Sequence, residues 1–130
     1  MRRAASHLLL LLATAAPSAG CVAAAAAGAG SAIYLTSRGA EGVVQGTVSD
    51  VAARSRAVME QEAIVPDASS TKSGGDEQEL KGKKGDLDVT FNIKRESPTT
   101  SKVEVTARKN LAEWDKNYAE ELLNKVVAKK

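Results

Sequence analysis

Strict alternation of hydrophobic and polar residues marks two segments in the second half of the chain, at residues 87–94 and 102–108. Because successive side chains of a β-strand point to opposite faces, each segment is predicted to be a strand with one hydrophobic and one polar face. The connection at residues 96–100 is short and contains Pro98, so the two strands are expected to form an antiparallel hairpin.

Two further strands are predicted from weaker patterns. Residues 42–48 carry β-branched side chains on both faces, whereas in residues 76–83 only Leu80 is hydrophobic. Polar residues at 67–75 predict a loop before the second of these strands, and Gly85–Asp86 predicts a tight turn after it.

Hydrophobic residues spaced three and four apart predict two helices. The first is expected to be capped by Ser49 or Asp50, to run to about Ala63 and to end before Pro66. The second is expected over residues 110–129, with early acidic and late basic residues that suit the helix dipole. The inner stripe of the first helix comprises Val51, Ser55, Val58, Met59, Glu62 and Ala63, with Arg54, Arg56, Glu60 and Gln61 outside it, and that of the second comprises Leu111, Trp114, Tyr118, Leu122 and Val126, with Ala119 and Leu123 beside it.

The predicted order of elements is β-α-β-β-β-α, which indicates an α+β fold. One-sided alternation favours a two-layer sandwich, in which an antiparallel sheet of about four strands has one face in water and the other covered by two helices. The chain is long enough for one domain of ordinary size. Only Phe91, Trp114 and Tyr118 supply aromatic side chains to that domain, so its core is expected to be thin.

The first 20 residues predict a signal peptide. Arg2 and Arg3 supply a positive start, the run from Leu8 to Leu12 is hydrophobic, and Pro17 to Gly20 provides a turn and small residues for cleavage. The hydrophobic run is too short for a bilayer, which needs about 20 helical residues. An uncleaved anchor that continues to Leu35 is the competing interpretation, and the proline and glycines within the segment disfavour it.

Cys21 is the only cysteine, so no internal disulfide can form. Together with Ser18, Ala19 and Gly20 it resembles a bacterial lipobox, although a Leu-type residue is commoner at the position of Ser18. The resemblance implies that Cys21 carries acyl chains, each buried CH₂ contributing about 0.8 kcal/mol to membrane binding. Val22 stands where an Asp would retain a lipoprotein in the inner membrane, so we expect the inner leaflet of the outer membrane, facing the periplasm.

An Ala/Gly-rich segment without a polar face follows Cys21 and extends to Ala32. This composition favours a spacer near the membrane surface, and a short apolar helix within residues 22–35 is the competing interpretation. The predicted organisation is therefore a signal peptide over residues 1–20, a lipid-anchored spacer over residues 21–39 and an α+β domain over residues 40–130.

The charge of the mature chain argues against a nucleic-acid partner. Arg2 and Arg3 are the only Lys or Arg residues before Cys21, so removing the signal lowers Lys plus Arg from 18 to 16, which equals the 16 Asp plus Glu. The formal net charge thus falls from +2 to 0. A neutral domain with interspersed signs lacks the clustered basic surface that nucleic acids require.

Residue types needed for most catalysis are missing from the mature chain. The only histidine is His7, inside the signal peptide, and acylation would consume Cys21. This excludes Ser-His-Asp and Cys-His catalysis and most transition-metal sites. We therefore expect no catalytic residues, no metal site and no cofactor.

Carboxylates remain as candidate chemistry. Asp86 and Asp88 would share a strand face and could form an acid–base pair, although a solvated face beside a turn is the simpler interpretation. Asp76, Glu77 and Glu79 suggest a calcium loop but lack its alternating ligands and glycine, which favours a solvated edge.

Two other groups of residues have alternative interpretations. Lys81, Lys83 and Lys84 could contact anionic headgroups, but an edge strand protected by lysines is the simpler explanation. Trp114 and Tyr118 are interpreted as core anchors of the last helix rather than as part of a ligand site.

The Gly20–Cys21 pair, the Ala/Gly run, the Ala32–Leu35 segment with its tyrosine and the order of elements together resemble a family of small bacterial lipoproteins. The family has no assigned biochemical role and no catalytic set to transfer. The resemblance covers nearly the whole mature chain, and the weak strand near Leu80 departs most from the more apolar pattern of the family.

These observations favour a non-enzymatic lipoprotein that docks another envelope protein on the polar face or an exposed edge of the sheet. The alternative is a carrier of a small apolar ligand or lipid, which predicts a pocket under Trp114 and Phe91. A hydrolase that uses carboxylates alone is a third hypothesis, and it requires two converging, partly buried acids.

Overall fold

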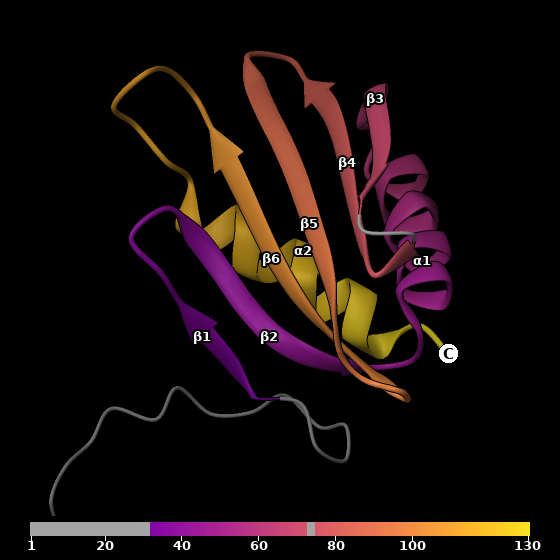
Figure 1. The fold of residues 1–130 in the computed structure, drawn as a ribbon. Coiled ribbons are helices and arrows are strands. Elements are labelled where there is room, and N and C mark those ends of the chain that lie inside the picture. The colour runs from indigo at the N-terminus through magenta and orange to yellow at the C-terminus, as the bar shows by residue number, and fades with distance from the viewer. Residues whose placement is uncertain (1–31, 73–74) are drawn as a thin grey trace, which may run out of the picture.

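The computed structural model describes residues 32–72 and 75–130, which form an α+β fold with one antiparallel sheet and two helices (Figure 1). The six strands lie in the order β1-β2-β6-β5-β4-β3. The elements are β1 (Ile33–Leu35), β2 (Gly39–Gln45), α1 (Val48–Gln61), β3 (Val65–Lys72), β4 (Glu77–Lys84), β5 (Leu87–Ser97), β6 (Thr100–Arg108) and α2 (Lys116–Ala128).

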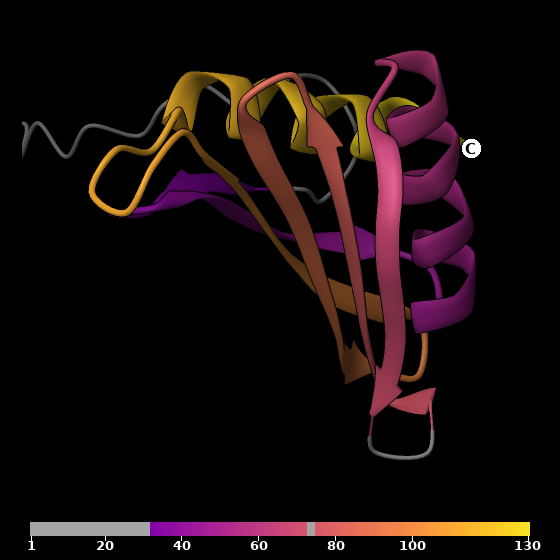
Figure 2. The same ribbon diagram turned by 90° about the horizontal axis from the view of Figure 1, so that it is seen from above.

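Both helices pack on one face of the curved sheet, α2 against β2 and β6 and α1 against β4 and β5 (Figure 2). Phe91 lies in the centre of the core with no exposed surface, opposite Leu80 on one neighbouring strand and Val105 on the other. The alternating strands supply the sheet side of the core, as the sequence predicts, and the intervening residues lie on the uncovered polar face. The α+β class is thus confirmed.

The sheet has six strands rather than about four. Strand β1 falls within residues 21–39, the range that the sequence assigns to the spacer, and pairs with β2 from Ile33↔Gly42 to Leu35↔Ala40. The first predicted strand also begins earlier, at Gly39 instead of residue 42, because its pairing with β6 extends to Gly39↔Thr106. This strand also ends earlier than predicted, at Gln45 instead of residue 48.

The second additional strand is β3, and the prediction of a loop over residues 67–75 is wrong for most of that range. Residues 65–71 are all exposed, so β3 has no hydrophobic pattern that a sequence could reveal. It is held by its antiparallel ladder with β4, which is interrupted by a register shift between Pro66 and Ala68. Backbone pairing, rather than side-chain burial, therefore makes this segment a strand.

Helix α1 begins two to three residues earlier than the predicted caps, Ser49 or Asp50, allow. Thr47 is the N-cap, and it forms a capping box in which its side chain accepts from the Asp50 backbone while the Asp50 carboxylate accepts from the Thr47 backbone. The Thr47 hydroxyl also donates to the Asp50 carboxylate at 2.8 Å, and this bond, together with the one from the Thr47 amide, lowers the pKa of Asp50. The inner-stripe residues Val51, Ser55, Val58 and Met59 are buried, as expected.

The C-terminal end of α1 has the hydrogen bonds of a Schellman motif. The Ile64 amide donates to the Met59 carbonyl at 2.8 Å, and the Ala63 amide donates to the Glu60 carbonyl at 3.1 Å. Ala63 adopts a φ of 54°, a left-handed conformation that glycine usually supplies at this position. Ala63 is exposed and Ile64 is buried, so the turn directs the chain from the helix into β3.

Helix α2 begins at Lys116, with Asp115 as its N-cap, rather than near residue 110. Just before it, Trp114 forms a bridge with Arg108 at the end of β6, and the Asp115 amide donates to the Ala107 carbonyl at 2.7 Å. The side chain of Asn110 accepts from the Ala112 and Glu113 amides, which forms a local turn that competes with a helix. Leu111, predicted to face the core, is consequently 93% exposed.

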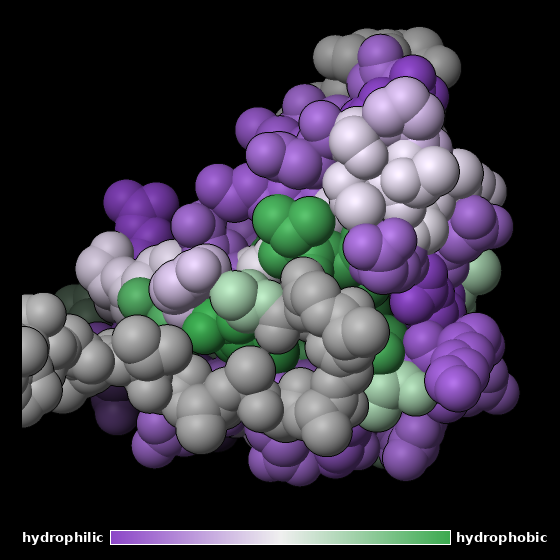
Figure 3. Space-filling view, turned by 90° about the horizontal axis from the view of Figure 1, so that it is seen from below, coloured by the Kyte–Doolittle hydropathy of each residue, from purple (hydrophilic) through white to green (hydrophobic). Residues whose placement is uncertain are grey.

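Figure 3 views the end of the molecule at which β1 begins and the β5–β6 hairpin turns. Hydrophobic residues group near the middle of this end and hydrophilic residues border them, as expected where the layer between sheet and helices reaches the end of a sandwich. No helix in the described part of the chain is long and apolar enough to cross a membrane.

Candidate functional site

The candidate site is a groove between α1 and the edge strand β3, with a volume of about 660 Å³. The two elements lie side by side in Figure 2, where β3 forms the last strand of the sheet. The groove is lined by Arg56, Met59, Glu60, Ala63, Ile64, Val65, Pro66, Asp67, Ala68, Ser69, Leu80 and Lys81. Its lining is mainly apolar, while its charged members come from α1, β3 and β4.

The floor of the groove depends on a close approach of α1 to β4. Met59 and Ile64 pack over Gly82, where an added Cβ would lie 2.6 Å from a side-chain carbon of each and 2.8 Å from the Val65 carbonyl oxygen. Any other residue at Gly82 would therefore push the end of the helix away from the sheet. Glycine at this position lets buried Leu80 and Met59 form a continuous apolar floor.

The open side of the groove is the free edge of β3. Within the described residues β3 pairs only with β4, so the backbone groups on its other side have no strand partner. Ser69 pairs with Leu80 across the ladder and therefore lies on the helix-facing side of the sheet. Its small side chain leaves the groove uncovered there. An exposed edge beside an apolar floor is an arrangement that accepts an added strand.

Four charged residues border the groove: Arg56, Glu60, Asp67 and Lys81. Lys81 pairs with Glu79 at 2.8 Å. Among the ion pairs of the described residues, none includes Arg56, Glu60 or Asp67. The rim thus carries exposed charges of both signs.

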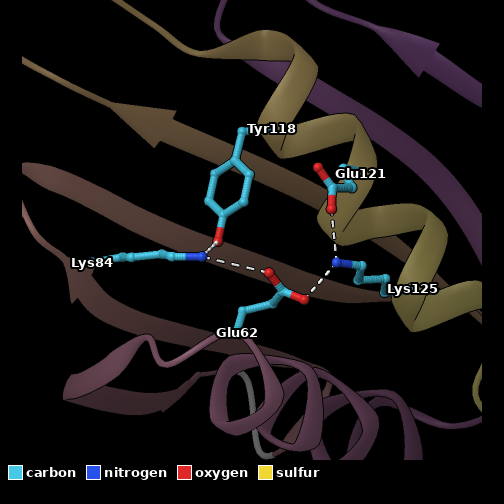
Figure 4. A network of polar contacts seen from close by, with 5 residues as sticks. All are labelled: Glu62, Lys84, Tyr118, Glu121 and Lys125. Atoms are coloured by element: carbon cyan, nitrogen blue, oxygen red, sulfur yellow. Dashed lines mark hydrogen bonds and ion pairs between the residues drawn. The ribbon is translucent and has the colours of Figure 1, made fainter.

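A polar network beside the groove fixes the C-terminal end of α1 (Figure 4). Glu62, whose side chain is 13% exposed, accepts a hydrogen bond from Lys125 of α2 and lies 3.5 Å from the Lys84 amine of β4. Lys84 also donates to the Tyr118 hydroxyl at 3.0 Å, and Lys125 donates to Glu121 at 2.7 Å. The network therefore joins the two helices and the sheet at one point.

The charges of this network shift the pKa values of its members. The hydrogen bond from Lys125 holds the pKa of Glu62 below its usual value, and the nearby Lys84 acts in the same direction. The pKa of Lys84 is raised by its hydrogen bond to Tyr118 and by Glu62, and that of Lys125 is raised by Glu121 and Glu62. All three groups are thus kept charged, which suits a structural link between elements more than proton transfer.

The carboxylates considered from the sequence are paired with cations. Asp88 lies 3.2 Å from Lys83 and 3.4 Å from Arg108, and these residues lower its pKa, whereas Asp86 is exposed. The three acids considered for a calcium loop pair as Asp76–Arg95, Glu77–Lys94 and Glu79–Lys81. Within residues 32–72 and 75–130, no three His, Cys, Asp or Glu side chains are grouped to hold a metal ion.

The lysine cluster is not on an edge strand, because β4 lies between β3 and β5. Lys81, Lys83 and Lys84 instead pair with Glu79, Asp88 and Glu62, respectively. The interpretation of these lysines as protection for an exposed edge is therefore wrong.

The two aromatic residues near α2 differ in environment. Trp114 precedes the helix and is half-buried, with the guanidinium carbons of Arg38 and Arg108 at 5.7 and 5.9 Å from its ring centre. Tyr118 packs against the core, as predicted, whereas the prediction of Trp114 as a core anchor of the helix is wrong. A hollow of about 290 Å³ beside Trp114 is lined mainly by polar residues, and Phe91 is fully buried, so the apolar groove lies elsewhere than the predicted pocket.

Ser18, Ala19, Gly20 and Cys21 lie outside the described residues, as do the predicted signal peptide and most of the spacer. The groove, by contrast, was not predicted, because its lining comes from three elements that only the fold brings together. The signal available in the sequence was the placement of Arg56 and Glu60 outside the inner stripe of the first helix.

Comparison with models of protein families gives no match for this chain, and neither curated proteins nor solved structures match it. The class of this protein is therefore defined by its fold, an α+β sandwich with a six-stranded antiparallel sheet. The resemblance to a lipoprotein family stays a prediction.

Proposed function

We propose that this protein is an exported bacterial envelope lipoprotein that acts as a non-enzymatic binding or structural module. Cys21 tethers it to the inner leaflet of the outer membrane, and the domain faces the periplasm. The groove between α1 and β3 is its recognition surface. The signal-like N-terminus and the single, well-placed cysteine support the tether, while the groove supports the binding role.

The observation that carries the binding role is an open edge strand directly beside an apolar floor. A protein segment that adds to β3 would gain main-chain hydrogen bonds along the edge and could place side chains over Met59 and Leu80. Tethering raises the local concentration of the domain at the membrane, so a modest intrinsic affinity is sufficient for such a role.

The state of the carboxylates supports a role without catalysis. A general acid at neutral pH needs a raised pKa. The pKa of Asp88 is instead lowered by Lys83 and Arg108, and the pKa of Glu62 is lowered by Lys125. Asp88 and Glu62 are therefore held as carboxylates paired with cations, and neither has the raised pKa that a general acid needs.

The groove also favours one second candidate function, a carrier of a small apolar ligand or lipid. Its volume of about 660 Å³ lies within the range of small-molecule sites, which is about 300–1,000 Å³. Its open side and charged rim suit a protein partner better, because a neutral hydrocarbon would leave those charges unmatched.

Two measurements test the proposal. The intact mass of the membrane-extracted protein should show an acylated Cys21, and an unmodified Cys21 or a soluble mature species would refute the tether. A photoreactive amino acid at Ser69, in the groove, should crosslink to an envelope protein in living cells. The matched control replaces Glu104 on the polar face of β6. Equal or absent crosslinking at both positions would refute the recognition surface, and a lipid adduct at Ser69 would favour the carrier.

A further inference from the structure

We infer that the occupant of the groove is a second copy of this chain, paired with the first along β3 around a two-fold axis. This inference rests on the proposed function of the groove as a recognition surface and names its partner. The two copies pair at β3 rather than at β1, because the edge of β3 is longer than the three residues of β1 and is flanked by an apolar floor.

Charge complementarity supports a second copy. Lys81 is already paired with Glu79, so the other charges of the rim are Arg56 against Glu60 and Asp67, and both signs are present. A partner of one sign would place a like charge opposite at least one of these residues, whereas a surface that carries both signs can complement itself after a two-fold rotation.

The arrangement of charges on α1 suits such a rotation. Arg56 and Glu60 lie one helical turn apart and both line the groove. A two-fold axis that is perpendicular to α1 and passes midway between these two residues would make the two α1 helices antiparallel and bring Arg56 of each copy opposite Glu60 of the other. Because the contact is isologous, each ion pair occurs twice.

The strand edge limits the pairing to one part of β3. Pro66 has no backbone N–H and lies at the register shift, so it cannot donate to an added strand. Residues 68–71 follow the shift without interruption and have small, exposed side chains. Antiparallel pairing of this segment with its copy would place Ser69 of one protein close to Ser69 of the other.

The test measures crosslinking between copies of the full-length chain in intact membranes. Ser69→Cys is treated with a short bis-maleimide, and the unsubstituted protein and Glu104→Cys serve as controls for Cys21 and for random collisions. Ser69→Cys should give a covalent dimer well above both controls. Because Glu60→Arg turns two exposed ion pairs into two like-charge contacts, it should weaken self-association about tenfold.

Charge exchange decides whether the pairing is the one described. Arg56→Glu in the Ser69→Cys background should also reduce the dimer, and Arg56→Glu combined with Glu60→Arg should restore it. Equal dimer yields at Ser69 and Glu104, or no restoration by the exchange, would overturn the inference. If photo-crosslinking at Ser69 captures a different envelope protein without any dimer, the second copy is refuted and the binding function stands. If photo-crosslinking at Ser69 captures no protein at all, both the second copy and the binding function are refuted.

Discussion

Ala63 closes α1 in a left-handed conformation. We therefore expect the substitution Ala63→Gly to stabilise this protein. An L-residue in this region costs about 1–2 kcal/mol relative to glycine. The greater freedom of glycine in the unfolded chain offsets about 0.5–1 kcal/mol of that gain. The Ala63 methyl is exposed, so its loss uncovers little buried surface.

The net expectation for Ala63→Gly is a gain of about 0.5–1 kcal/mol, which raises Tm by about 2–8 °C for a domain of this size. Thermal unfolding of the purified protein, followed by circular dichroism, measures the shift. The matched control is Ala53→Gly, an exposed position within α1, which should destabilise by about 1 kcal/mol. The reasoning is refuted if both substitutions lower Tm by similar amounts.

Three other substitutions test the core, the approach of α1 to the sheet and the polar network. Phe91→Ala should destabilise by about 3–5 kcal/mol because Phe91 is fully buried, with Phe91→Leu losing clearly less; urea denaturation measures both, and equal losses would contradict the packing argument. Gly82→Ala should destabilise by about 1–3 kcal/mol through overlap with Met59 and Ile64, and an unchanged urea midpoint would show that the helix end can shift freely. The lowered pKa of Glu62 contributes stability that is present above its ordinary pKa of 4.5 and is lost as pH falls below it. Between about pH 6 and pH 3, the stability of Glu62→Gln should therefore fall less steeply than that of the unsubstituted protein, and parallel profiles would exclude this contribution.

The sequence predicts the parts of the fold that bury hydrophobic side chains. Phe91 and Val105 lie in strictly alternating segments, and both are in the core. The same logic cannot detect β3, where no side chain of residues 65–71 is buried. Its structure depends on a ladder with β4, and pairing partners are not encoded in local hydrophobic spacing.

Helix boundaries depend on polar contacts that compete with the hydrophobic pattern. Leu111 has the right spacing for the second helix, but the turn at Asn110 and the cap at Asp115 begin the helix later. Thr47 and Asp50 have the three-residue separation of a capping box, so this N-terminus was detectable from the sequence. The groove could not be detected from the sequence, because its depth depends on how closely the end of α1 approaches Gly82.

Strands β1 and β3 are the two opposite margins of the sheet, and four strands separate them. At a spacing of about 4.8 Å between strands, they lie about 24 Å apart along the sheet. The described part of the chain begins at β1, so a pair joined through β3 would have its two β1 strands at its outer ends. With the tether proposed at Cys21, assembly and anchoring would then use opposite margins of the sheet, and two tethered copies would be able to pair without release from the membrane.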